Sequence, residues 1–175
     1  MLKIILIVIV VLIAAILAYA ATRPSNFRVQ RKTSIKAPPE KIFPLIADFH
    51  NWTSWSPWEK KDPALKRTYS GAANGKGAVY AWEGNRNVGS GRMEITDASS
   101  PSRIEIKLDF IKPFEGHNVT LFTLQPEADA TVVTWDMHGP MAYMAKVFGI
   151  FVNMDKMIGN DFETGLANLK AVAEK

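Results

Sequence analysis

Between residues 65 and 138 the sequence alternates repeatedly between apolar and polar residues with a period of two. In the clearest run, 104–110, isoleucine, leucine and phenylalanine alternate with charged residues. This period places every second side chain on one face, as in a strand that buries one side of a sheet. Turn-forming pairs such as Gly84-Asn85 and Lys112-Pro113 separate the runs. The pattern predicts about six consecutive strands joined by short turns, and therefore an antiparallel meander.

Helical patterns lie on both sides of this region. Segment 27–36 alternates as a first strand, and the sequence Ala-Pro-Pro-Glu at 37–40 ends it and opens a helix, because proline is tolerated in a first helical turn. A second short helix is expected through 52–55, and a further helical piece at 141–152. Apolar residues recur every three or four positions over 154–169, which indicates a long amphipathic helix. It is the only element long enough to cover the apolar face of the sheet.

The chain begins with an unbroken apolar run of 18 residues, Ile4 to Ala21. As a helix this run would be about 27 Å long, close to the hydrocarbon thickness of a bilayer. A helix of a soluble core would keep a polar stripe, and this run has none. We therefore expect a transmembrane anchor over 1–22, a linker over 23–26 and one soluble domain over 27–175.

The fate and orientation of the first segment remain open between alternatives. Ala18-Tyr19-Ala20 matches a signal-peptidase pattern, so residues 1–20 are alternatively a cleaved signal peptide. A retained anchor is favoured because only Lys3 precedes the run and because the run is long for a signal peptide. The positive residues after it place the domain in the cytoplasm, whereas the cleavage pattern argues for export. We expect a single-pass anchor in a bacterial inner membrane.

Composition excludes several classes of function. The chain has no cysteine, which excludes disulfides, thiolate metal sites and a cysteine nucleophile. Its net charge is +4, but outside residues 23–36 the positive residues are scattered. Nucleic-acid binding needs a clustered basic face, so we expect no nucleic-acid partner.

Three histidines are candidates for metal or acid–base chemistry: His50, His117 and His138. None shows the short helical spacing of metal ligands. His138 or His117 paired with Asp136 or Glu115 would make a general base, and Asp136 shares strand parity with His138. The same positions fit a solvent-facing side equally well. We predict no metal site, no cofactor and no catalytic residue.

Several motifs follow one another in a characteristic order. They comprise a proline-containing helix start, a tryptophan-rich segment, the two arms of a central hairpin, a late strand and a closing helix: 35–43, 51–58, 77–85, 88–93, 131–135 and 162–170. In this order they resemble the SRPBCC/START-like superfamily, and within it the polyketide cyclase/dehydrase-like branch. The resemblance extends over essentially 27–175.

This resemblance implies an α+β helix-grip fold, in which a curved antiparallel sheet wraps around a long C-terminal helix and encloses a cavity. One N-terminal transmembrane helix precedes it here. In such folds the concave sheet face and the inner helix face line the pocket. The candidate ligand-binding residues are the aromatic and apolar residues at these places: Trp82, Trp135, Met154, Met157, Ile158 and Phe162. Plain core packing is the competing interpretation for each of them.

Three functions follow as hypotheses, because this fold carries enzymes, lipid carriers and hormone sensors alike. The first is a membrane-tethered, non-catalytic binder of a small hydrophobic molecule or lipid, attached through residues 4–21. The second is a cyclase or dehydratase acting on a polyketide-like or aromatic substrate. The third is an envelope interaction module without a ligand. One helix is about 10 Å wide and six strands span roughly 29 Å, so we expect part of the core to be an open cavity.

Overall fold

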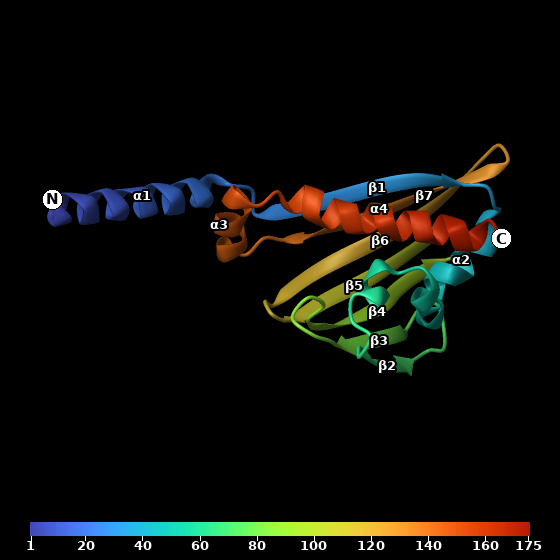
Figure 1. The fold of residues 1–175 in the computed structure, drawn as a ribbon. Coiled ribbons are helices and arrows are strands. Elements are labelled where there is room, and N and C mark those ends of the chain that lie inside the picture. The colour runs from blue at the N-terminus through green and yellow to red at the C-terminus, as the bar shows by residue number, and fades with distance from the viewer.

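The computed structural model describes all 175 residues and consists of a seven-stranded antiparallel sheet, helices on one of its faces and one projecting helix (Figure 1). The strands are β1 (Asn26–Ile35), β2 (Lys66–Gly71), β3 (Ala78–Glu83), β4 (Ser90–Ser99), β5 (Arg103–Lys112), β6 (Gly116–Glu127) and β7 (Ala130–Pro140). The helices are α1 (Leu2–Thr22), α2 (Pro39–Ala47), α3 (Tyr143–Phe151) and α4 (Met154–Ala173), with the 3₁₀ helices η1 (Phe49–Ser54) and η2 (Pro57–Lys60).

The strand order is β1-β7-β6-β5-β4-β3-β2, so the six strands from β2 to β7 form the predicted meander. The first strand of the chain pairs with the last, in a register that runs from Asn26 opposite Pro140 to Ile35 opposite Thr131. The helix predicted to open at 37–40 begins at Pro39. The helix-grip fold expected from the sequence is confirmed.

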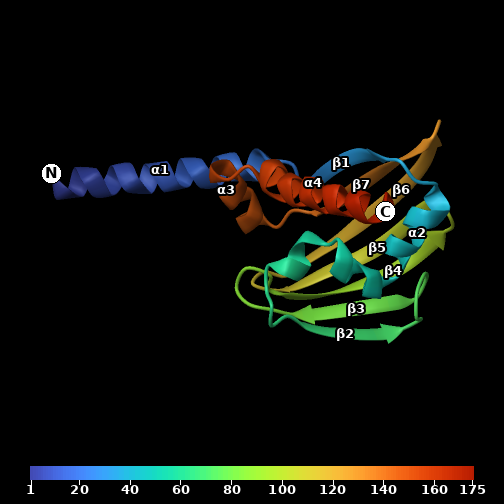
Figure 2. The same cartoon turned by 45° about the vertical axis from the view of Figure 1, so that its right-hand side comes forward.

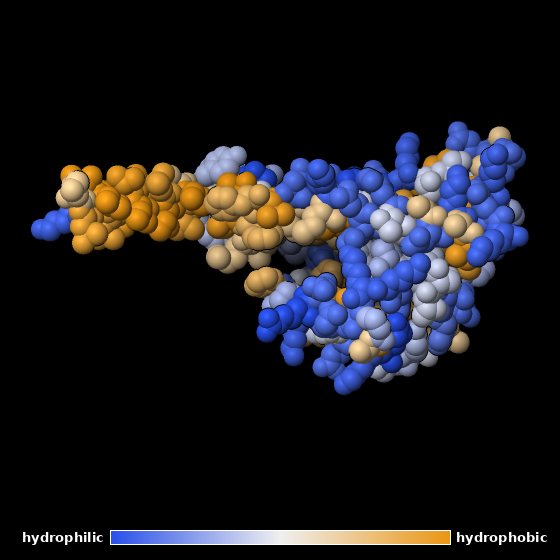
Figure 3. All heavy atoms as spheres, in the orientation of Figure 1, coloured by the Kyte–Doolittle hydropathy of each residue, from blue (hydrophilic) through white to orange (hydrophobic).

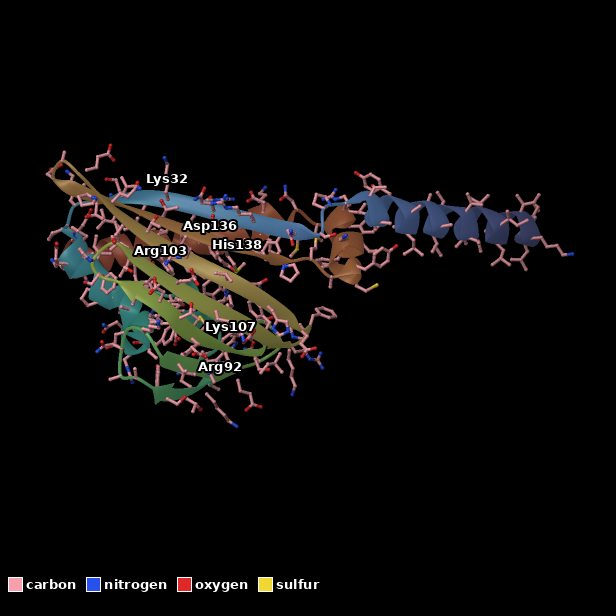
Figure 4. All side chains as sticks on the ribbon, turned by 180° about the vertical axis from the view of Figure 1, so that it is seen from behind. Lys32, Arg92, Arg103, Lys107, Asp136 and His138 are labelled. Carbon is pink, nitrogen blue, oxygen red and sulfur yellow. The ribbon has the colours of Figure 1, made fainter.

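The two faces of the sheet differ in chemistry because successive side chains alternate between them. On β7, Val133 and Trp135 face the helices and are buried, whereas His138 faces away from them. The outer face carries most of the charged side chains of the strands, including those labelled in Figure 4, whereas Arg31 and Arg67 face inward and pair with carboxylates of the covering helices. Ion pairs neutralise many of these charges, such as Arg103 with Asp97 at 2.7 Å. The inner face is therefore the apolar one.

More than one helix covers the inner face, which corrects the expectation that the terminal helix does so alone. α4 lies over β1 and β7, while α2, η1 and η2 lie over the other half of the sheet (Figure 2). Trp52 and Trp55 anchor this second cover, since their indole nitrogens donate hydrogen bonds to the carbonyls of Ile46 and Leu45 at 2.9 and 2.8 Å. Both rings are buried beneath the 3₁₀ segments.

α1 projects from the domain and is the one helix that is long and apolar enough to cross a membrane, a property that signal sequences share. Its side chains form a continuous hydrophobic surface (Figure 3). Where it meets the domain it contacts α3, and the Tyr143 hydroxyl donates a hydrogen bond to the Leu17 carbonyl at 2.7 Å.

Candidate ligand-binding site

Two of the six sequence-predicted site residues meet in the middle of the core. The rings of Trp135 and Phe162 are stacked, with centroids 4.2 Å apart and planes inclined by 7°. Phe122 on the next strand lies 4.8 Å from Trp135, and Trp55 lies 5.7 Å from it on the side of the 3₁₀ segments. These aromatic rings fill the centre of the space between sheet and helices.

The other four predicted residues lie toward the end of the domain where α4 begins. Trp82 on β3 is half-buried, and its ring meets that of Phe110 edge to face at 5.9 Å. Met154 and Ile158, in the first turns of α4, are also half-buried. Met157 lies on the outer side of the helix with 48% of its surface exposed. The structure thus brings Trp135 and Phe162 together and places Met157 apart from them.

At this end of the domain the inner face of the sheet is open. One row of inward-facing residues crosses the strands through Leu108, Asn118, Gly139 and Phe27. Leu108 and Phe27 point inward yet are only half-buried. Trp82 and Phe110, which lie next to this row and closer to the ends of their strands, point inward and are half-buried as well. Figure 3 shows the surface hollowed between the start of α4 and the sheet. We name this hollow, with its partly exposed apolar wall, the recess.

Polar groups without partners occur in the inner wall. Asn118 and Thr120 face inward from β6 and are largely buried as residues, but their side-chain polar atoms form no hydrogen bond within the protein and keep some contact with solvent. The indole nitrogen of Trp135 is the one side-chain polar atom that is fully buried without a partner. Buried donors and acceptors are almost always paired, so these groups are available to a bound molecule.

The sequence interpretation missed Asn118 and Thr120. A signal was present, because both residues have the parity of the buried Phe122 and Leu124 on the same strand. The signal was obscured because the alternate residues of β6, such as Val119, are apolar too, so the sequence did not show which set of residues faces the core.

A closed polar network lies at the far side of the inner face, between η2, β2 and β3. The buried carboxylate of Glu59 accepts hydrogen bonds from the Tyr80 hydroxyl at 2.8 Å and from the Arg67 guanidinium at 2.6 Å. Burial, and then the hydrogen bond to this carboxylate, raise the pKa of Tyr80 far above its usual value. Arg67 also donates a hydrogen bond to the Leu65 carbonyl at 2.9 Å, and the network fixes η2 on the sheet.

The histidines lie away from the recess. His138 and His117 face outward, and their Nδ1 atoms lie 3.1 Å from Asp136 and 2.7 Å from Asp109. Two shallow depressions of about 300 and 360 Å³ occur on this outer face, and both include His117. The chain has no group of three or more histidine, aspartate or glutamate residues able to hold a metal ion. The acid–base pair considered from the sequence therefore lies across the sheet from the apolar wall.

Comparison with known proteins gives one family and many similar folds. Residues 26–174 match the family described as polyketide cyclase/dehydrase and lipid transport. No curated protein matches the sequence.

Among solved structures, protein CV1439 from Chromobacterium violaceum is 16% identical, with a TM-score of 0.60 over 87% of this chain and 99% of that one. Major latex-like protein 151 from Panax ginseng is 12% identical, with a TM-score of 0.62 over 87% of this chain and 100% of the other. The Aha1 protein from Colwellia psychrerythraea is 17% identical, with a TM-score of 0.58 over 85% and 96%.

Proposed function

Since the chain belongs to the polyketide cyclase/dehydrase and lipid-transport family of the SRPBCC superfamily, we propose that it is a membrane-tethered binder or carrier of a small hydrophobic molecule. α1 holds the domain at the membrane, and the recess receives the ligand. Trp82, Met154 and Ile158 form its walls, while the stack of Trp135 and Phe162 closes its inner end.

The observation that carries this proposal is the set of polar groups left unpaired in an apolar wall. A structural core rarely leaves an indole nitrogen without an acceptor, as that of Trp135 is. Ligand sites are mostly apolar, with a small number of polar groups that orient the bound molecule. Trp135 offers a donor, Asn118 offers both a donor and an acceptor, and Thr120 offers a hydroxyl.

This chemistry selects a class of ligand. The open end of the inner face is bounded by aromatic and aliphatic side chains such as Trp82, Phe110 and Leu108. The buried carboxylate of Glu59, at the far side of this face, is paired with Arg67. A neutral or weakly polar compound with an apolar body and one hydrogen-bonding group matches the open end. Lipids and isoprenoid-like molecules have this form. Met157 lies at the rim, on the exposed side of α4.

A second candidate function is an interaction module without a ligand. It is favoured by the aromatic cluster around Trp135, which fills the centre of the core. The two functions differ in what the recess does: a carrier admits an apolar chain there, and an interaction module does not.

A photoreactive fatty acid tests the proposal on the full-length protein in lipid nanodiscs. Its diazirine tail should crosslink to peptides containing Trp82, Phe110 or Met154, located by mass spectrometry. Leu108→Trp, which fills the recess, should remove most of this labelling. Leu121→Trp is the matched control, because Leu121 is equally half-buried but faces outward on the neighbouring strand. Labelling confined to α1 and the outer surface, in wild type and both variants, would favour the interaction module.

A further inference from the structure

α3 has the reverse of the usual polarity of a surface helix. Three of its large apolar side chains are exposed, with 70% of the surface of Met144, 54% of Phe148 and 69% of Phe151 accessible. Its only charged residue, Lys146, is its one buried residue and donates a hydrogen bond to the Ser25 hydroxyl at 3.0 Å. Surface helices normally turn apolar residues inward and charges outward, so the outer side of α3 is unsuited to water.

The contacts of α3 fix its position beside the end of α1. The Tyr143 hydroxyl binds the Leu17 carbonyl at 2.7 Å, and the Met141 amide binds the Ser25 carbonyl at 2.7 Å. Leu17 lies five residues before Thr22, where α1 ends. At 1.5 Å per residue this is a depth of about 7.5 Å. Helices that lie in a membrane interface bury their apolar face by roughly 5–10 Å, so α3 lies at that level if α1 spans the bilayer.

A second apolar element lies at the same end of the domain. The end of β5 and the residues that join it to β6, together called the β5–β6 turn, expose Ile111 over 57% of its surface and Phe114 over 82%. This turn points toward the side from which α1 projects, in both views of the ribbon (Figures 1 and 2). At the opposite end, the turn between β6 and β7 exposes Glu127 and Asp129. Large apolar side chains are therefore exposed only at the end that faces α1.

We infer that this end of the domain rests on the lipid–water interface of the bilayer that holds α1. The contact surface consists of the exposed apolar residues of α3, the start of α4 and the β5–β6 turn: Met144, Phe148, Phe151, Met157, Ile111 and Phe114. The inference rests on the proposed membrane tether and goes beyond it, because a tether alone leaves the domain free to rotate. The bilayer is the occupant because the surface continues directly from α1 through the Tyr143–Leu17 hydrogen bond.

This placement gives the recess an orientation. The recess opens at the end of the inner face where α4 begins, between α4 and the strand ends that carry Trp82 and Phe110. With α3 and the β5–β6 turn on the bilayer, that opening faces the lipid. An apolar ligand would then pass between bilayer and protein without crossing bulk water.

Depth-dependent quenching tests the inference on the full chain, whose lack of cysteine allows single-site labelling. Four single-cysteine variants, Val10→Cys, Phe148→Cys, Phe114→Cys and Glu127→Cys, carry a bimane fluorophore. Each is reconstituted into vesicles of phosphatidylcholine and phosphatidylglycerol that contain nitroxide-labelled phospholipid. Val10 reports the insertion of α1, and Glu127 is the control at the opposite end. Circular dichroism checks that each variant is folded.

We expect quenching at Val10, Phe148 and Phe114, by at least twofold over the residual signal at Glu127. Quenching at Val10 without quenching at Phe148 and Phe114 would overturn the inference and leave the tether intact. Quenching at Phe148 and Phe114 without Val10 would support the interfacial contact and overturn the tether. No quenching at any of the three positions would overturn both.

Discussion

The indole ring of Trp135 on β7 lies parallel to the phenyl ring of Phe162 on α4, with 4.2 Å between their centroids. The stack joins the sheet directly to its covering helix, and both side chains are almost completely buried. Offset or parallel aromatic pairs add stabilisation to that of burial alone. The packing of α4 against the sheet therefore depends strongly on this pair.

Phe162→Ala should lower the free energy of unfolding by about 3–5 kcal/mol, the range for truncation of a buried phenylalanine. Met157→Ala on the exposed side of the same helix should change it by no more than about 0.5 kcal/mol. Denaturant unfolding of the full-length protein in detergent, followed by circular dichroism, measures both. A loss below about 1 kcal/mol for Phe162→Ala would mean that α4 does not hold the sheet.

Gly165→Ala should destabilise the protein although alanine favours helices. A Cβ atom at position 165 would lie 2.7 Å from the Trp135 ring, so α4 would have to move away from the sheet. Overpacking of this kind costs about 1–3 kcal/mol, against about 1 kcal/mol of helix propensity gained. At Gly149, in α3, an added Cβ would meet nothing within 4 Å. Gly149→Ala should thus raise the melting temperature, and Gly165→Ala should lower it; equal effects would contradict the close approach.

Tyr80 should make stability fall at high pH. Its folded pKa is raised, so above about pH 10 an unfolded tyrosine ionises while the folded one keeps its proton. The folded state then binds more protons, and stability decreases as pH rises further. In Tyr80→Phe this contribution disappears, and the free energy of unfolding should decline less steeply between pH 9 and 11, a window of about two units around the ordinary tyrosine pKa. Identical slopes in wild type and variant would show that Tyr80 ionises equally in both states.

The intact protein should fractionate with membranes and resist extraction by high salt, since α1 is long and apolar enough to span a bilayer. Deletion of residues 1–22 should release the domain into the soluble fraction. Fractionation with N-terminal mass analysis measures both outcomes. A mostly soluble wild-type protein that begins at Ala21 would identify a cleaved signal peptide.

The fold was accessible from sequence because each element has a simple periodic cause. Alternation in 104–110 places Ile104 and Ile106 on the buried side of β5, as the structure has them. The three- and four-residue spacing of Phe162, Leu166 and Leu169 likewise identifies the buried side of α4.

The site was less accessible because periodicity assigns residues to a face without saying how much of that face is covered. The 3₁₀ segments bring Trp52, Trp55 and Trp58 over the sheet, and this filling depends on long-range packing. The sequence interpretation grouped Met157 with Met154 and Phe162 on one apolar side of α4, yet Met157 is exposed. At about 100° per residue, Met157 is turned about 140° away from the buried Phe162, so the helical phase of α4 itself places Met157 on the outer side.

The pairing of β1 with β7 has a consequence for synthesis of the chain. Asn26 and Pro140 are register partners, so 114 residues must be added after Asn26 before Pro140 is made. At roughly 5–20 residues per second, translation takes about 6–23 seconds over this interval. Throughout that time β1 lacks its partner strand, and because β1 is the edge of the finished sheet, β7 is the only strand that pairs with it. The first strand of the chain is therefore placed in the sheet only after synthesis of β7, so β1 joins the fold late.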